Sequence, residues 1–146
     1  MTTTTVGTDT QLASRLRLSV MRLARVLRQK AQDPVTPSQL SALFSVERDG
    51  PVTISELAAL EGVQPPTMTR IVAALEEQAL VVREADPADR RVSRLHITTA
   101  GRRLLERNRG RKTAYLASRI RGMSAEDIDV LERAAALLER MTADER

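Results

Sequence analysis

Residues 53–98 read TISELAALEGVQPPTMTRIVAALEEQALVVREADPADRRVSRLHIT, and this stretch decides the fold. A capping box opens with Thr53 and predicts a short helix over about 54–61, which Gly62 ends by supplying a left-handed residue. A second helix begins at Pro65, because proline is tolerated in a first helical turn. Two short helices joined by a tight turn at a glycine predict a helix-turn-helix.

The second of these helices has an apolar face, and the sequence after it changes to a period of two. The expected face consists of Met68, Ile71, Val72, Leu75 and Ala79. Strands are predicted over 80–84 and 92–98, separated by the turn-rich loop 85–91 with its adjacent arginines. A hairpin directly after a helix-turn-helix is a wing, so the sequence predicts a mostly α fold with a small β wing.

Helices are also predicted on both sides of this winged helix-turn-helix. Apolar residues recur at steps of three and four from Leu12 to Leu27, which indicates an amphipathic helix. Before the winged unit, one helix is expected over 10–31 and a second begins at a capping box over 36–39. After it, a long helix is expected over 99–121 and a last helix begins after Ser124. Residues 1–9 are expected to form a disordered tail.

The composition is that of an ordinary globular chain with few aromatic residues. Among 146 residues there are one Phe, one Tyr, no Trp and no Cys. Such a core favours helix-on-helix packing, and the scarcity of aromatic rings argues against a platform that stacks single-stranded bases. Without cysteine, and with His96 as the single histidine, we expect no enzyme, no cofactor and no metal site. Without an apolar run of membrane length or an export signal, we expect a cytoplasmic protein with no membrane contact.

The net charge of +4 is unevenly distributed along the chain. Residues 1–32 contain six basic and one acidic residue, 101–121 contain eight and one, and 122–146 contain three and seven. The apolar stripes of the first and last helices have no obvious partner within a small winged domain. Interleaving these helices across a twofold axis buries the apolar stripes and brings the acidic last helix close to the basic helices, which predicts a homodimer. Packing both helices within one chain is the alternative.

These observations predict a single domain built from two kinds of segment. We expect one domain over 10–146, with dimerisation helices in 10–35 and 99–146 and a DNA-binding lobe in 36–98. The basic balance favours nucleic acid as the partner. The excess of Arg over Lys, 21 to 2, can also follow from genome composition.

Candidate DNA contacts lie on the second helix of the helix-turn-helix and on the wing. Arg70 is the best candidate for a bidentate guanine contact in the major groove, and Arg90 and Arg91 can reach a narrow minor groove. Asp89 is expected to hold a neighbouring guanidinium by a charge-assisted bond, and Asp86 to cap the turn. The full predicted set is Gln64, Pro66, Thr67, Thr69, Arg70, Asp89, Arg90 and Arg91. A merely solvated helix face and a merely solvated hairpin are the alternatives.

The tract DPADRRVSRLHIT at 86–98 resembles the wing of the MarR (multiple antibiotic resistance regulator) family. The wing signature of that family is Asp-x-Arg, then five residues, then Leu-Thr. It is matched here at Asp89, Arg91, Ile97 and Thr98, followed by Gly101. The stretch 69–72 with 75–76 also resembles the family's recognition helix, and the order of helices agrees over nearly the whole chain.

This resemblance implies a homodimer with interleaved terminal helices on a pseudo-palindromic double-stranded DNA site. It implies a transcriptional regulator, most often a repressor, released by a small and frequently anionic aromatic ligand. It also implies Arg91 in the minor groove with Asp89 bracing it. Ala79 stands where the family usually has glycine, so we expect a tight or strained turn there. The lack of cysteine excludes thiol oxidation as the signal. A winged-helix protein-interaction module without DNA function is the alternative.

An effector pocket is expected where the dimerisation helices meet the DNA-binding lobe. The residues expected to line it are Arg15, Leu18, Val35, Phe44 and Tyr115. Packing in a core poor in aromatic residues is the alternative role for Tyr115. His96 lies between two apolar residues of a predicted strand and is expected to point outward into solvent.

Overall fold

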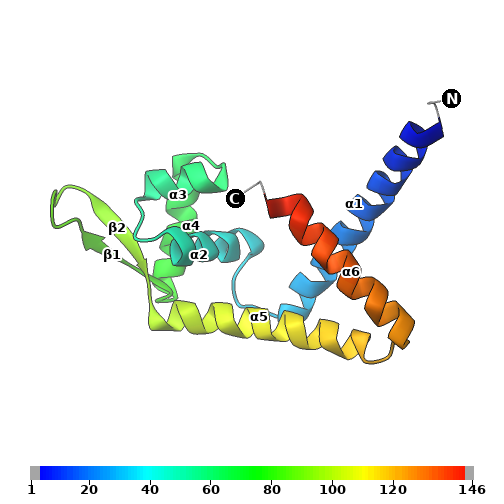
Figure 1. The fold of residues 1–146 in the computed structure, drawn as a ribbon. Helices are drawn as coiled ribbons and strands as arrows, with labels where there is room; N and C mark the ends of the chain where they lie inside the picture. The colour runs from blue at the N-terminus through cyan, green and yellow to red at the C-terminus, as the bar shows by residue number, and fades with distance from the viewer. Residues whose placement is uncertain (1–3, 144–146) are drawn as a thin grey trace.

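The computed structural model describes residues 4–143 of the chain. Its elements are α1 (Thr4–Ala31), α2 (Pro37–Asp49), α3 (Ile54–Glu61), α4 (Pro65–Glu77), β1 (Val81–Ala85), β2 (Ser93–Ile97), α5 (Thr99–Ile120) and α6 (Ala125–Thr142). The two strands form an antiparallel wing after α4, which confirms the predicted fold class (Figure 1). The wing and the start of α1 lie at opposite ends of the molecule (Figure 1).

The first helix is longer than the sequence predicts. It begins at Thr4, so the expectation of a disordered tail is wrong for residues 4–9, and residues 1–3 lie outside the described part of the chain. Adding one residue to an existing helix fixes one residue and gains one hydrogen bond. Weak helix formers such as threonine can therefore extend a helix that the apolar stripe has already established.

The predicted helix starts in the winged unit are confirmed by their capping geometry. Both Thr36 and Thr53 form complete capping boxes with the residue three positions later. In the second box, Thr53 Oγ1 accepts the Glu56 N–H at 3.1 Å, and Glu56 Oε2 accepts the Thr53 N–H at 3.0 Å. Gly62 has a φ of +63° and ends α3 in the left-handed region, as expected.

The core lies between α2, α3, α4, the base of the wing and the first turns of α5. It is aliphatic, and its fully buried large side chains include Leu43, Leu57, Met68, Leu75, Leu95 and Leu105. Val52 pairs with Leu95 as an isolated bridge, so the segment before α3 adds one rung to the wing. The wing register pairs Val81 with Ile97 and Ala85 with Ser93.

The turn between α4 and β1 differs from the expected pattern at one residue. Ala79 was expected on the apolar face of α4, but it is exposed, lies beyond the helix and has a φ of +57°. Thr98 holds this turn, because its Oγ1 donates to the carbonyl oxygens of Ala79 at 2.7 Å and Leu80 at 3.1 Å. The same hydroxyl accepts the N–H of Gly101 and caps α5. The turn is therefore tight and left-handed, which is the conformation expected at a position where the MarR family usually has glycine and this chain has Ala79.

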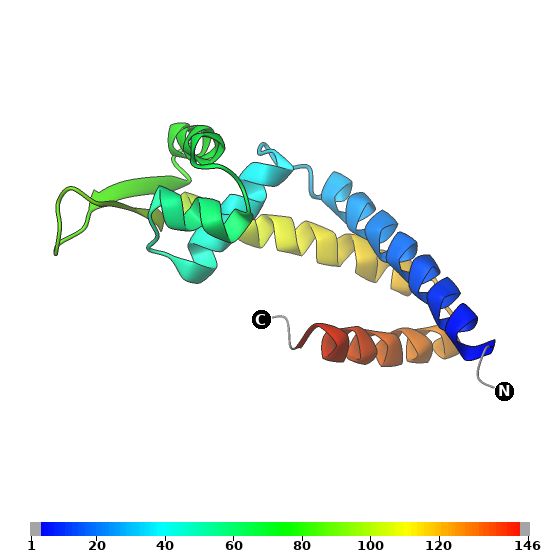
Figure 2. The same cartoon turned by 90° about the horizontal axis from the view of Figure 1, so that it is seen from above.

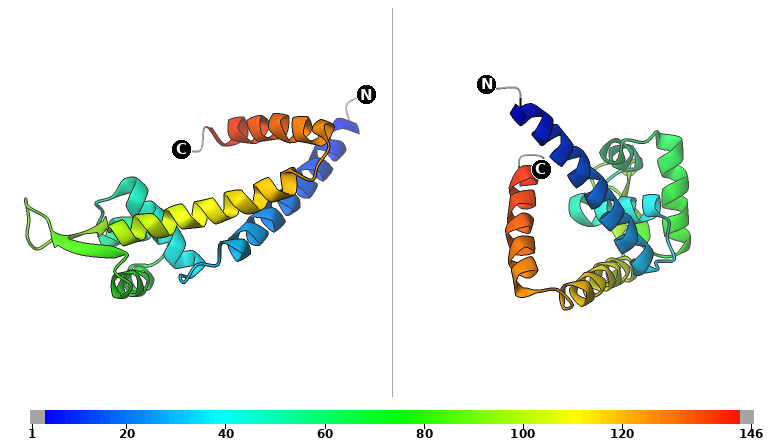
Figure 3. Two further views of the ribbon diagram at one scale, coloured as in Figure 1. Left: turned by 90° about the horizontal axis from the view of Figure 1, so that it is seen from below. Right: turned by 90° about the vertical axis from the view of Figure 1, so that its right-hand side faces the viewer.

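The long helices extend away from the winged lobe. α1 contacts α5, which extends away from the base of the wing, and α6 folds back from the far end of α5 (Figures 1 and 2). α6 stands off from the lobe (Figure 3), and none of its residues Ala125–Thr142 is buried. Within residues 4–143, no helix is long and apolar enough to cross a membrane.

Candidate nucleic-acid interface

The exposed face of α4 contains most of the predicted groove-contacting residues. Gln64, Pro66, Thr69 and Arg70 are exposed, whereas Thr67 is half-buried. Thr69 Oγ1 donates to the Pro65 carbonyl oxygen at 3.0 Å, which leaves this hydroxyl its lone pairs as acceptors. Within the described residues 4–143, Arg70 takes part in no ion pair. This helix face can therefore present a free guanidinium and small polar groups to a partner.

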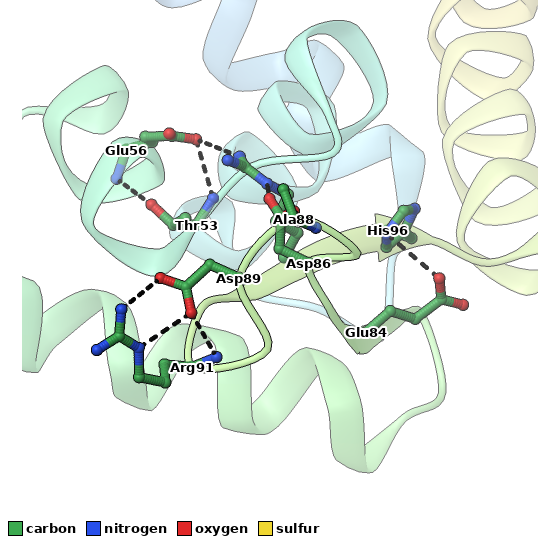
Figure 4. A network of polar contacts seen from close by, with 9 residues as sticks. Thr53, Glu56, Glu84, Asp86, Ala88, Asp89, Arg91 and His96 are labelled. Atoms are coloured by element: carbon green, nitrogen blue, oxygen red, sulfur yellow. Dashed lines mark hydrogen bonds and ion pairs between the residues drawn. The ribbon is translucent and has the colours of Figure 1, made fainter.

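The wing loop fixes the direction of Arg91. Arg91 Nε donates to Asp89 Oδ1 at 3.0 Å and its Nη2 donates to Asp89 Oδ2 at 3.1 Å (Figure 4). Asp89 Oδ1 also accepts the backbone N–H of Arg91 at 3.1 Å, and the Arg91 side chain remains 89% exposed. The hydrogen bonds from Arg91 lower the pKa of the Asp89 carboxyl. The expected bracing of a wing-tip guanidinium by Asp89 is thus confirmed, and Arg90 beside it is exposed.

Asp86 caps the wing turn as predicted, and it also binds an arginine that sequence reasoning missed. Its Oδ1 accepts the Ala88 N–H at 2.8 Å, and its Oδ2 accepts from Arg94 Nε at 2.5 Å. The hydrogen bond from Arg94 lowers the pKa of Asp86 and raises the pKa of Arg94. The register sets Arg94 opposite Glu84, so a sequence argument would pair those two charges instead.

Two further side-chain contacts involve residues of the wing strands. Arg83 Nε donates to Glu76 Oε1 of α4 at 2.8 Å, which ties β1 to the last turn of that helix. His96 Nε2 lies 3.5 Å from Glu84 Oε2 (Figure 4). The His96 side chain is 38% exposed, so it points outward as expected but is partly covered. A small cavity of about 140 Å³ between α2, β2 and α5 is lined in part by this histidine.

The residues expected to form an effector pocket are not gathered at one place within a single chain. Val35 lines a cavity of about 260 Å³ at the junction of α1 and α2. Arg15 and Leu18 are exposed on α1. Phe44 lies under the Arg109 guanidinium, 5.0 Å from ring centroid to Cζ, and Tyr115 lies 5.4 Å from Lys30 Nζ. The full lining of the cavity is Arg28, Gln29, Gln32, Asp33, Val35, Pro37 and Leu40.

Contacts between α5 and the end of α1 surround this cavity. Arg111 Nη1 donates to the carbonyl oxygens of Ala31 at 2.7 Å and Gln32 at 3.2 Å. Asn108 is fully buried and its Nδ2 donates to Asp33 Oδ2, while its Oδ1 has no hydrogen-bond partner among the described residues. Among those residues, no group of three or more His, Asp or Glu is placed to hold a metal ion.

Comparisons with known proteins agree on one family. A model described as the MarR family matches residues 35–93. An uncharacterised HTH-type transcriptional regulator of Mycobacterium leprae is 39% identical over 134 residues, which cover 91% of this chain and 94% of that protein. The HTH-type transcriptional repressor MdtR of Bacillus subtilis is 33% identical over 96 residues, which cover 62% of each chain.

Solved structures share the fold over nearly the whole chain. A transcriptional regulator protein from Pseudomonas aeruginosa has a TM-score of 0.84 at 37% identity, covering 92% of this chain and 96% of that one. A mutant of MepR from Staphylococcus aureus, bound to an oligodeoxyribonucleotide, has a TM-score of 0.70 at 21% identity. That likeness covers 92% of this chain and 98% of MepR, and it is a likeness of fold.

Proposed function

Because the chain belongs to the MarR family of DNA-binding transcriptional regulators, which are not enzymes, we propose that it is a homodimeric repressor. In this proposal the dimer reads a pseudo-palindromic double-stranded DNA site and leaves it when a small ligand binds. The observation that carries the proposal is that the exposed face of α4 and the exposed tip of the wing follow each other directly in the chain. The face of α4 with Arg70, which forms no ion pair among residues 4–143, leads through the turn at residues 78–80 into a wing that displays the braced Arg91.

Each element suits a different groove of DNA. Arg70 projects from a helix, the element that fits the major groove, where a guanidinium can bind guanine O6 and N7. Arg91 projects from the tip of a narrow hairpin and is held by Asp89 with its side chain exposed, which suits insertion into a narrow minor groove. MepR, which has the same fold, is bound to an oligodeoxyribonucleotide in its solved structure, and this supports DNA as the partner.

A second copy of this chain is the proposed occupant of the exposed apolar faces of α1 and α6. Those faces contain Leu12, Leu18, Val20, Met21, Leu23, Val130, Leu131, Leu137, Leu138 and Met141, all exposed in the single chain. α1 is basic and α6 is acidic, so a twofold pairing brings opposite charges together. Sedimentation equilibrium should give twice the chain mass of 16.1 kDa. A Leu131→Asp variant should shift the population toward the monomer.

Ligand release is proposed to act at the junction between α1 and the lobe. The cavity beside Val35 includes Arg28, a cation suited to a small anionic aromatic ligand. Asp33 lines the same cavity and binds Asn108 of α5, so a ligand there touches the contacts that join α1 to the lobe. A ligand that binds the non-DNA geometry more tightly shifts the dimer away from DNA. Benzoate, as a simple anionic aromatic probe, should raise the Kd for the operator.

Fluorescence anisotropy tests the proposal on DNA from upstream of the protein's own gene, with scrambled DNA as the control and salt varied. Selective binding that weakens steeply with salt supports the proposal. Arg91→Ala should weaken binding broadly across sequences and reduce the salt slope by about one phosphate contact, whereas Arg70→Ala should also relax sequence preference. Arg133→Ala, on the polar side of α6, is the matched control.

The outcomes separate the two candidate functions. Equal and weak binding of both DNAs, with little effect of salt, would favour a winged-helix module that binds a protein. Unchanged operator affinity in Arg91→Ala or Arg70→Ala would contradict the role assigned to that residue. If benzoate leaves the operator Kd unchanged while DNA is read selectively, the release proposal for this ligand class fails and the DNA-binding proposal stands.

A further inference from the structure

The side chain of Arg94 joins the wing to the first helix of the helix-turn-helix. Its Nε donates to Asp86 Oδ2 at 2.5 Å and its Nη1 donates to Glu56 Oε2 at 3.5 Å. Asp86 belongs to the wing loop, whereas Glu56 belongs to α3 and precedes Arg94 by 38 residues. The Glu56 carboxylate is itself held in place by the capping box with Thr53. The guanidinium therefore connects the wing loop to a fixed point on the helix-turn-helix.

The other strand of the wing is tied to the other helix of the motif. Arg83 of β1 binds Glu76 of α4, while Arg94 of β2 reaches α3. The hydrogen bonds of the loop itself run from the Asp86 N–H to the Val92 carbonyl and from the Val92 N–H to the Asp89 carbonyl. These bonds fix the shape of the loop but not its angle to the helices. The Val52–Leu95 bridge anchors the base of the wing, and the two ion pairs hold the wing's angle to the helices from both sides.

We propose that Arg94 is a positioning residue for DNA binding, which sets the wing at a fixed angle to α3 and α4 so that Arg91 meets the minor groove. This inference rests on the proposed function. A wing that is oriented before binding loses less conformational freedom when DNA binds. Arg94 and Asp86 are only partly exposed, at 32% and 16%, whereas Arg91 is 89% exposed, so Arg94 is less accessible to a phosphate than Arg91.

The Asp86→Asn variant distinguishes an effect of Arg94 on the position of the wing from an effect of the Asp86 charge on DNA binding. Asparagine keeps an Oδ1 that accepts the Ala88 N–H, but it replaces the oxygen that receives Arg94 with an N–H donor. Loss of a negative charge near DNA predicts tighter binding, whereas loss of the Arg94 contact predicts weaker binding. Because exposed ion pairs make small contributions, we expect an operator Kd about threefold higher than that of the wild type. An equal or lower Kd would overturn the positioning role.

A double-mutant cycle tests whether Arg94 acts through Arg91. Arg94→Lys keeps the charge but loses the fork that reaches both carboxylates, so its operator Kd should rise about as much as that of Asp86→Asn. In an Arg91→Ala background, neither substitution should raise the Kd further. Additive losses in the double variants would mean that Arg94 acts independently, as a general structural group or a direct phosphate contact, and would overturn the proposal.

Two controls keep the result interpretable. Asp49→Asn removes the acidic partner of the exposed Arg48 at the end of α2 and should leave the operator Kd unchanged. Thermal unfolding of each variant shows whether the fold is intact. If the wild type binds no DNA selectively, the proposed function fails and Arg94 has no such role. If the wild type binds selectively and Asp86→Asn binds as tightly, only the positioning role fails.

Discussion

Replacing Ala79 with glycine is expected to stabilise the protein. Ala79 has a φ of +57°, and its methyl group is exposed, so its removal loses little packing. The turn keeps its other bonds, because the Ala79 N–H donates to the Glu76 carbonyl oxygen and the Ala79 carbonyl oxygen accepts from Thr98. The substitution therefore changes mainly the backbone preference at one residue.

The size of the effect follows from two opposing terms. An L-residue in the left-handed region costs about 1–2 kcal/mol, and glycine avoids this cost. Glycine also gains freedom in the unfolded chain, which offsets about 0.4–1 kcal/mol. The expected net gain is about 0.5–1 kcal/mol, which corresponds to a rise in Tm of about 2–3 °C for a chain of this size.

Circular-dichroism melts of wild type and Ala79→Gly at equal protein concentration measure the difference, since the Tm of the proposed dimer would depend on concentration. Ala73→Gly is the matched control, because Ala73 is exposed on α4, where glycine costs about 1 kcal/mol. The control should melt at a lower temperature than the wild type. If Ala79→Gly also lowers the Tm, the left-handed turn is not the source of strain and the reasoning is wrong.

Other predictions concern two glycines and the wing carboxylate. Gly101→Ala should destabilise the protein by about 1–3 kcal/mol, because the new Cβ would lie 2.4 Å from the Leu80 carbonyl oxygen. Gly110→Ala, with nothing within 4 Å, should stabilise it by about 0.5–1 kcal/mol, and urea titrations that gave both variants the same sign would contradict this contrast. NMR titration should give Asp89 a pKa below its ordinary value of about 3.9. A lowered pKa means that the pair with Arg91 stabilises the folded state at neutral pH, and that this contribution disappears as pH falls through the lowered pKa. In Arg91→Ala the pKa should return toward the ordinary value.

The features predicted correctly from the sequence are mostly local. The capping boxes at Thr36 and Thr53 involve residues three positions apart, and the left-handed Gly62 depends on its own backbone. The bracing of Arg91 by Asp89 spans two residues. Interactions at this range follow from residue type and spacing, because the backbone conformation between the partners is nearly fixed.

The features missed from the sequence depend on packing between distant segments. Arg94 binds Asp86 and Glu56, and the choice of these partners over the cross-strand Glu84 depends on how the hairpin sits against α3. Phe44 and Tyr115 lie beneath Arg109 and Lys30 respectively, and these pairings also join distant segments, while the role of the two rings in an effector pocket stays a prediction. Neither outcome could be derived from periodicity, which gives the face of an element but not its neighbour.

The distribution of ion pairs in the winged unit bears on how it would distinguish DNA sequences. Residues 65–100 contain five basic and five acidic residues, so the segment has no net charge. Its ion pairs are Arg83–Glu76, Arg91–Asp89 and Arg94–Asp86, which leave Arg70 and Arg90 without an acidic partner among the described residues. A surface with many free cations binds any DNA through its phosphates. In the proposed DNA complex, a surface with two free cations and one braced arginine would gain less from non-specific contacts, so its affinity would depend more on whether the grooves match the positions of those side chains.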